Sequence, residues 1–146
     1  MRIHEVLASK PTQDVVTVTP DATVRELVGV LAEHNIGALV VSVDGGSVDG
    51  IVSERDVVRR LNEDEAVLES PVSAIMSTEV ETCEGSATVN DLMHVMTERR
   101  FRHIPVVDDE GRLSGIMSIG DVVKHRMSEL QFERDQLDSS VQSSQT

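Results

Sequence analysis

The chain has 146 residues, of which 39% are hydrophobic and 27% charged, and these proportions are typical of a globular protein with one or two small domains. A formal net charge of -13 argues against a general nucleic-acid-binding protein, because phosphate backbones are bound by an excess of lysine and arginine. Cys83 is the single cysteine, so no internal disulfide can form, and no apolar run approaches the roughly 20 residues of a membrane span. We therefore expect a cytoplasmic protein whose partners include neither nucleic acid nor membrane.

The first half of the chain contains five predicted elements. The Val/Thr-rich segment 14–19 predicts a short strand. A helix is predicted next, with Asp21 as its N-cap, by four apolar residues at positions i, i+3, i+4 and i+7: Val24, Leu27, Val28 and Leu31. Segments 38–43 and 48–52 predict two strands joined by a glycine-containing turn, which makes a hairpin. A second helix is expected to begin at Ser53.

The second half of the chain repeats the first. A shift of 65 residues aligns residues 15–58 with 80–123 without a gap, and 17 of the 44 aligned positions are identical. This half therefore repeats the order strand–helix–strand–strand–helix, with Ser86 as the expected cap of its first helix and Ser118 at the start of its second. A unit of about 45 residues buries too little surface to be stable alone, so we expect the two repeats to pack against each other. The predicted fold class is α+β, with two pseudo-symmetric β-α-β-β-α repeats.

The expected boundaries follow from this repeat. Residues 1–62 are predicted to form the first repeat with an N-terminal helix, and the acidic residues 63–70 a linker. Residues 71–130 are predicted to form the second repeat. Residues 131–146 are expected to contain the end of the last helix and a flexible tail, because the final residues are polar and low in apolar content.

Each repeat contains the phrase Gly-Ile-x-Ser-x-x-Asp-Val-Val, at residues 50–58 and 115–123. A Ser followed three residues later by an acid is close to a capping box, in which side chains bind the free backbone N–H groups of a helix start. The same position suits a ligand, because a helix N-terminus favours phosphate and a carboxylate there can accept both hydroxyls of a ribose. The residues alone leave both roles open, since one does not exclude the other.

The order of elements, with the phrases "GIVSERDVV", "GIMSIGDVV" and "RFRHIPVVDDEGRLSGIMSIGDVV", resembles tandem CBS domains, a family named for cystathionine β-synthase. The resemblance covers nearly all of residues 1–127. In this family two repeats form a disc-like pair, the Bateman module, and adenosine-containing ligands such as AMP, ADP, ATP, NAD or S-adenosylmethionine bind in two clefts between the repeats. The resemblance implies that Asp56 and Asp121 hold ribose hydroxyls and that Ser53 and Ser118 contact ribose or phosphate.

The two clefts are not expected to be equal. In nucleotide-binding CBS pairs, basic residues at the position of Arg102 and His103 reach the phosphates, and Gly120 leaves room for a phosphate where the first repeat has Arg55. We therefore favour one cleft, to which the resemblance assigns Ser118, Gly120, Asp121, Arg102 and His103, with Asp14, Val16, Ile36 and Gly37 around the adenine. The other cleft is expected to be weaker or empty, and it contains Ser53, Arg55 and Asp56.

The resemblance implies a regulatory module that binds an adenine nucleotide, associates as a homodimer and acts on a separate effector protein. An alternative is a structural or interaction dimer with vestigial clefts. A third function, an enzyme acting on a nucleotide, finds no support in the motifs, because the chain has neither a P-loop nor a Gly-x-Ser-x-Gly turn. The five histidines lack the spacing of metal ligands, so no metal or other cofactor is expected. Cys83 aligns with Val18 and is expected at a buried strand position rather than as a nucleophile.

Overall fold

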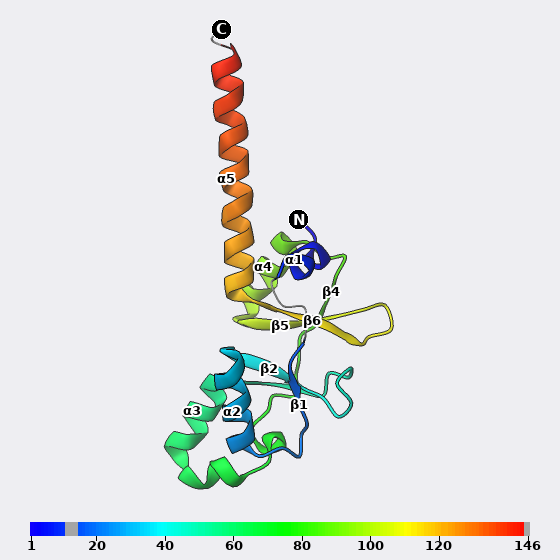
Figure 1. The fold of residues 1–146 in the computed structure, drawn as a ribbon, viewed down its shortest axis with the longest axis vertical. Coiled ribbons are helices and arrows are strands. Elements are labelled where there is room, and N and C mark those ends of the chain that lie inside the picture. The colour runs from blue at the N-terminus through cyan, green and yellow to red at the C-terminus, as the bar shows by residue number, and fades with distance from the viewer. Residues whose placement is uncertain (11–14, 145–146) are drawn as a thin grey trace.

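A computed structural model describes residues 1–10 and 15–144, which form two halves stacked on one another (Figure 1). The elements of the first half are β1 (Thr17–Val18), α2 (Val24–His34), β2 (Ala38–Val41), β3 (Gly50–Ser53) and α3 (Glu54–Glu63). Those of the second half are β4 (Cys83–Glu84), α4 (Val89–Arg99), β5 (His103–Val107), β6 (Leu113–Ser118) and α5 (Ile119–Ser144). The predicted α+β class and the predicted element order, strand–helix–strand–strand–helix in each repeat, are both confirmed.

The two sheets have the same topology. Their strand orders are β1-β2-β3 and β4-β5-β6, with the first pair of strands parallel and the second pair antiparallel in each sheet. Ala38 pairs with Ser53 in one sheet and His103 with Ser118 in the other, so the 65-residue shift holds in the backbone register. Cys83 begins β4, a strand position as predicted, but it is partly rather than fully buried. This partial burial raises the pKa of its thiol to about 11, which keeps the thiol protonated at neutral pH.

The first helix of each repeat is capped two residues later than predicted. Thr23 and Thr88, rather than Asp21 and Ser86, occupy the N-cap positions of α2 and α4. The Thr23 hydroxyl accepts the backbone N–H of Glu26 at 3.1 Å, and the Glu26 carboxylate accepts the Thr23 N–H at 3.3 Å. This reciprocal pair satisfies two backbone donors at the start of the helix.

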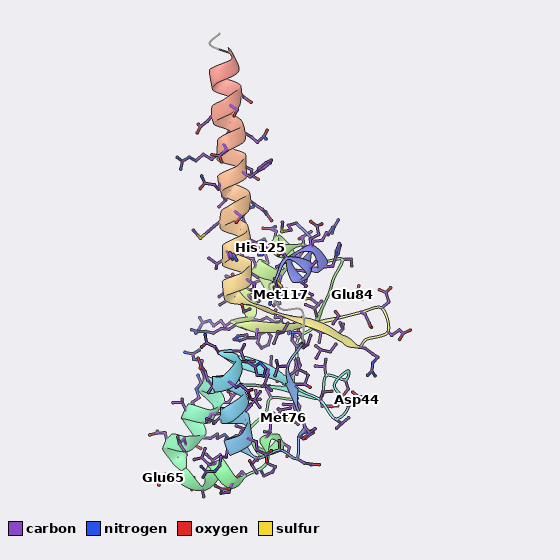
Figure 2. All side chains as sticks on the ribbon, in the orientation of Figure 1. Asp44, Glu65, Met76, Glu84, Met117 and His125 are labelled. Atoms are coloured by element: carbon purple, nitrogen blue, oxygen red, sulfur yellow. The ribbon has the colours of Figure 1, made fainter. Side chains whose placement is uncertain are left out.

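The core of each half is completed by a segment that lies outside its repeat. The segment before the first repeat packs into the second half, and the segment between the repeats packs into the first half. The N-terminal helix α1 (Ile3–Ser9) buries Ile3 and Val6 in the core of the second half, beside α4 (Figure 1). The 3-10 helix η2 (Val72–Ala74) and the residue after it bury Val72 and Ile75 in the core of the first half. Met76 and Met117, labelled in Figure 2, belong to these two separate cores.

The backbone contacts of these two segments match one another. The N–H of Ile3 donates to the carbonyl oxygen of Ala87 at 2.9 Å, and the N–H of Val72 donates to that of Ala22 at 2.8 Å. Ala22 and Ala87 are aligned by the 65-residue shift, so Ile3 and Val72 are structural counterparts. This second correspondence has a spacing of 69 residues, four more than the shift that aligns the two repeats.

Two segments near the predicted boundaries are helical. The acidic segment after α3 forms the 3-10 helix η1 (Glu65–Glu69), which buries Val67 against the first core. Helix α5 continues past the second half to Ser144 and extends away from the rest of the molecule (Figure 1). The predicted boundaries at residues 62, 71 and 130 remain predictions. Across residues 1–10 and 15–144, no helix combines the length and the apolar character needed to cross a membrane.

Candidate functional site

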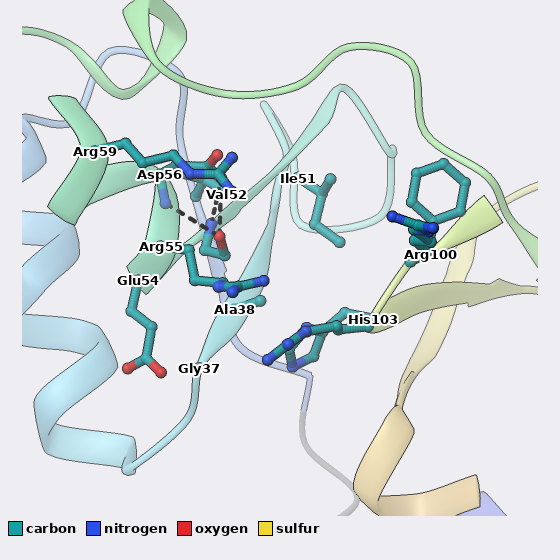
Figure 3. A pocket seen from close by; sticks show the side chains of 13 residues that line it. Gly37, Ala38, Ile51, Val52, Glu54, Arg55, Asp56, Arg59, Arg100 and His103 are labelled. Carbon is teal, nitrogen blue, oxygen red and sulfur yellow. Dashed lines mark hydrogen bonds between the residues drawn. The ribbon is translucent and has the colours of Figure 1, made fainter. Parts of the chain in front are cut away.

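A cavity of about 370 Å³, called here the Asp56 cleft, lies where the start of α3 faces the segment that leads into β5. The first half contributes Gly37, Ser53, Glu54, Arg55, Asp56 and Arg59 to its lining. The second half contributes Arg100, Phe101, Arg102 and His103. Figure 3 shows the side chains of Arg55 and His103 extending from the two halves toward the same space. The cleft is therefore built by both repeats.

Ser53 and Asp56 form a capping box at the start of α3. The backbone N–H of Asp56 donates to Ser53 Oγ at 3.3 Å, and Asp56 Oδ2 accepts the Ser53 N–H at 2.8 Å and the Ser53 hydroxyl at 3.0 Å. Asp56 Oδ1 has no hydrogen-bond partner among the described residues. The capping role is thus present, and it leaves one carboxylate oxygen of Asp56 to interact with a bound molecule.

Positive charge gathers at the Asp56 cleft. Four of the chain's 13 basic residues line it, namely Arg55, Arg59, Arg100 and Arg102, against the two carboxylates Glu54 and Asp56. Within the described residues none of these four arginines forms an ion pair or a side-chain hydrogen bond. Other basic side chains are paired, for example Arg25 with Glu69 and Arg99 with Glu81. In a chain with a net charge of -13, this cleft is a local site of attraction for an anion.

His103 lies between the two halves. Burial lowers the pKa of its imidazole, Asp121 opposes this shift, and Arg102 adds to it. The imidazole is therefore mostly neutral at pH 7 and can still donate one hydrogen bond to a phosphate oxygen. The carbonyl oxygen of Arg102 accepts the backbone N–H of Ile119 at 2.8 Å, which holds the segment before β5 in place.

Gly37 forms a narrow part of the Asp56 cleft, opposite His103 (Figure 3). A Cβ added there would lie 3.6 Å from Glu54 Oε1 and 3.8 Å from His103 Cε1. Phe101 also lines the cleft and is partly buried against the second core. It is thus both a core side chain and a candidate contact for a ligand.

A second cavity of about 490 Å³, the Val16 cavity, is also lined by residues of both halves. Its lining includes Val16 and Ile36 from the first half, and Gly115 and Ile116 from the second. It also includes Lys10, whose ammonium group lies 2.8 Å from Asp121 Oδ2 and donates to the carbonyl oxygen of Ile116 at 2.8 Å.

Asp121 caps α5 as Asp56 caps α3. Its Oδ2 accepts the backbone N–H of Ser118 at 2.9 Å, and its own N–H donates to Ser118 Oγ at 3.1 Å. Burial acts to raise the pKa of the Asp121 carboxyl, but Lys10 and the Ser118 N–H outweigh it and the pKa is lowered. Asp121 is therefore an ionised carboxylate that already has a cationic partner.

The structure groups the predicted site residues differently from the sequence interpretation. Arg102 and His103 line a cavity with Ser53, Arg55 and Asp56, not with Ser118, Gly120 and Asp121. Gly37 also lines the Asp56 cleft, whereas Val16 and Ile36 line the Val16 cavity. Gly120 lies in a shallow groove on α5 with Ile119 and Val123, and Asp14 lies outside the described residues. The cause is the face-to-face contact of the halves, which brings the segment before β5 onto the helix start of the other repeat.

Three basic residues near the clefts were missed by the sequence interpretation as candidate site residues. Arg59 follows Arg55 by one helical turn, so the spacing i, i+4 could have indicated that both lie on one face of α3. Arg100 is the C-cap residue of α4 and also lines the Asp56 cleft. Lys10 carried no local signal, since its partner Asp121 is 111 positions away in the chain.

Comparison with known families identifies the repeats. The family model of the CBS domain matches residues 3–63 and again residues 72–128. The chain belongs to the CBS domain family. The predicted recognition as a tandem CBS pair is thereby confirmed, and the two matches correspond to the two halves of the structure.

Relatives and solved structures agree with this assignment. CBS domain-containing protein YhcV of Bacillus subtilis is 32% identical over 117 residues, covering 80% of this chain and 82% of YhcV. The CBS-domain containing protein ATU1752 from Agrobacterium tumefaciens has a crystal structure with a TM-score of 0.80 and 45% identity, covering 86% of this chain and 99% of that one. The CBS domain protein PAE2072 from Pyrobaculum aerophilum, solved in complex with AMP, has a TM-score of 0.73 and 28% identity, covering 83% and 89%.

Proposed function

We propose that this CBS pair is a regulatory module that binds an adenosine-containing nucleotide, and that the Asp56 cleft is its principal site. The observation that carries the proposal is the convergence of four arginines, each without an ion pair among the described residues, on a cavity that also holds Asp56. The AMP complex of the Pyrobaculum aerophilum relative supports an adenosine ligand for a CBS pair of this kind. This choice reverses the sequence-based preference for the cleft at Asp121.

The residues of the Asp56 cleft suit the parts of such a ligand. Asp56 would accept ribose hydroxyls through the oxygen that the cap leaves free, since a charged acceptor binds hydroxyl donors strongly. Arg102 would place a forked guanidinium against the phosphate, and His103 would add a neutral donor. The adenine would pack against Ile51 and the ring of Phe101, which are apolar parts of the lining.

Isothermal titration of the chain with AMP and with adenosine tests this proposal. We expect binding of AMP, with weaker binding of adenosine because the arginines lose their phosphate partner. The variant Asp56→Asn keeps an oxygen for the cap and removes the charge, so it should lose most of the affinity. The absence of binding by AMP, ADP, ATP, NAD and S-adenosylmethionine would contradict the proposal and favour a structural dimer. Turnover of the nucleotide, followed by chromatography, would instead indicate an enzyme.

We also propose that the module is a homodimer associated through α3 and α5 and that it acts on a separate effector protein. Large apolar side chains on these helices are exposed: Val58, Leu61, Ile119, Val123 and Met127. Val58 and Val123 are aligned by the repeat, so the two helices present related apolar faces. Light scattering tests this association. Val123→Glu should yield monomers, whereas Val43→Glu, at an exposed position in a hairpin, should not.

A further inference from the structure

We infer that Lys10 is a built-in counter-ion for Asp121, so that an adenosine ligand fills the Asp56 cleft alone while Lys10 remains in place. The inference rests on the proposed function and deepens it, because it states which of the two clefts is occupied and why. It depends on an ion pair with Lys10 that Asp121 has and Asp56 lacks among the described residues.

The two carboxylates share their backbone capping contacts and differ in their cationic partner. Asp56 Oδ2 and Asp121 Oδ2 each accept the backbone N–H of the serine three residues before them, at 2.8 Å and 2.9 Å. Asp121 Oδ2 also contacts Lys10 Nζ at 2.8 Å, and both of these side chains are only about a quarter exposed, at 24% and 26%. Asp56 has no cationic partner among the described residues.

Lys10 is held by two acceptors at once. Its ammonium group also donates to the carbonyl oxygen of Ile116, in the strand that lines the Val16 cavity. A ribose that used Asp121 would have to displace this ammonium, and neutral hydroxyl donors are weaker partners for a carboxylate than a charged donor. The displaced ammonium would also leave the Ile116 carbonyl without its hydrogen bond.

The counterpart of Lys10 in the other half carries the opposite charge. Extended along the sequence, the 69-residue spacing that relates Ile3 to Val72 pairs Lys10 with Glu79. Glu79 is exposed and makes no ion pair among the described residues. The segment that supplies Lys10 to Asp121 in one half therefore supplies no cation to Asp56 in the other.

Titration calorimetry with AMP measures the consequence as a stoichiometry. We expect one AMP per wild-type chain and two per Lys10→Met chain, because methionine keeps the unbranched stem and removes the charge. The control is Lys124→Met, which makes the same charge change at the chain's other lysine, on the exposed side of α5, and should leave the value at one. In the double variant Lys10→Met with Asp56→Asn, the remaining site should be the one at Asp121.

Two AMP molecules per wild-type chain, or one per Lys10→Met chain, would overturn the inference while leaving the proposed function intact. If no chain binds AMP, the proposed function fails, and the role of Lys10 is decided without ligand. The pKa of the Asp121 carboxyl, followed by carbon-detected NMR, should then be higher in Lys10→Met than in the wild type. An unchanged pKa of the Asp121 carboxyl would overturn the inference. His103, which also interacts with Asp121, is present in both the wild type and Lys10→Met and therefore does not contribute to the difference.

Discussion

The start of α3 and the start of α5 are built alike and surrounded differently. Each has a serine at the N-cap and an aspartate three residues later, with the same reciprocal hydrogen bonds. At Asp56 the opposite half supplies arginines and His103, whereas at Asp121 the N-terminal segment supplies Lys10. A duplicated motif therefore conserves the helix cap, and the neighbours that each copy meets across the interface decide what the cap can bind.

The largest expected effect concerns the two cores rather than the clefts. Ile3→Ala should lower the free energy of unfolding by about 2–5 kcal/mol, because Ile3 is fully buried and the substitution leaves a cavity. Denaturation in urea measures the change. Hydrogen exchange then locates it: amides of β5 and β6 should lose protection before those of β2 and β3, although α1 precedes the first half in the chain. Loss confined to β2 and β3 would contradict the assignment of α1 to the second core.

Asp56→Asn and Asp121→Asn compare the two carboxylates directly. We expect Asp56→Asn to weaken AMP binding by about 10- to 100-fold, which corresponds to the roughly 1.5–3 kcal/mol of hydrogen bonds to a charged acceptor. Asp121→Asn should change the affinity by less than about threefold, because that carboxylate is already paired with Lys10. Titration calorimetry measures both. Equal losses would show that the two clefts bind alike.

Arg102→Met tests whether Arg102 binds the phosphate of the ligand or its nucleoside part. The affinity for AMP should fall by about tenfold, since one charged donor to the phosphate is lost, while the affinity for adenosine should be nearly unchanged. Arg112→Met is the matched control, because Arg112 is exposed, pairs with Asp44 and is not part of the cleft lining. Parallel loss for AMP and adenosine would argue for a structural role of Arg102.

The smallest expected effect is the pH dependence due to His103, whose counterpart in the first half is Ala38. Burial lowers the pKa of His103 in the folded chain below its unfolded value of about 6.5, so the unfolded chain takes up a proton first as the pH falls. The free energy of unfolding should thus be fully retained above pH 6.5 and decrease as the pH falls through the interval below it. Urea denaturation of His103→Gln should show a shallower decrease. Identical profiles would exclude His103 as the source.

Much of the fold could be predicted because the repeat is gapless. The 65-residue shift places β2 against β3 and β5 against β6 in the same register, and the helix starts at Ser53 and Ser118 follow from local capping chemistry. Hydrophobic period and cap residues are short-range signals that one copy of the unit already contains. The caps of α2 and α4 were predicted two residues too early. Asp21 is a common N-cap residue type and lies close to Thr23, but Thr23 forms the capping box with Glu26.

The contents of the clefts could not be predicted in the same way. Arg102 and Asp121 belong to one repeat and are close in the chain, yet Arg102 faces Asp56, because contact between the halves decides which residues share a cavity. The contact of Lys10 with Asp121 follows from the packing of α1 into the second core, which no local pattern in the sequence indicates. Alignment of the two repeats alone stops at Val15 and does not reach Lys10.

The crossing of α1 into the second core has a consequence for biosynthesis. Ribosomes make α1 before any of the elements on which it packs, and Met117, a fully buried neighbour in that core, is added more than a hundred residues later. Domains often acquire structure from the N-terminal side as they are translated. This helix instead has to remain without its partners until nearly the whole pair has emerged, with Ile3 and Val6 open to chaperones in the meantime.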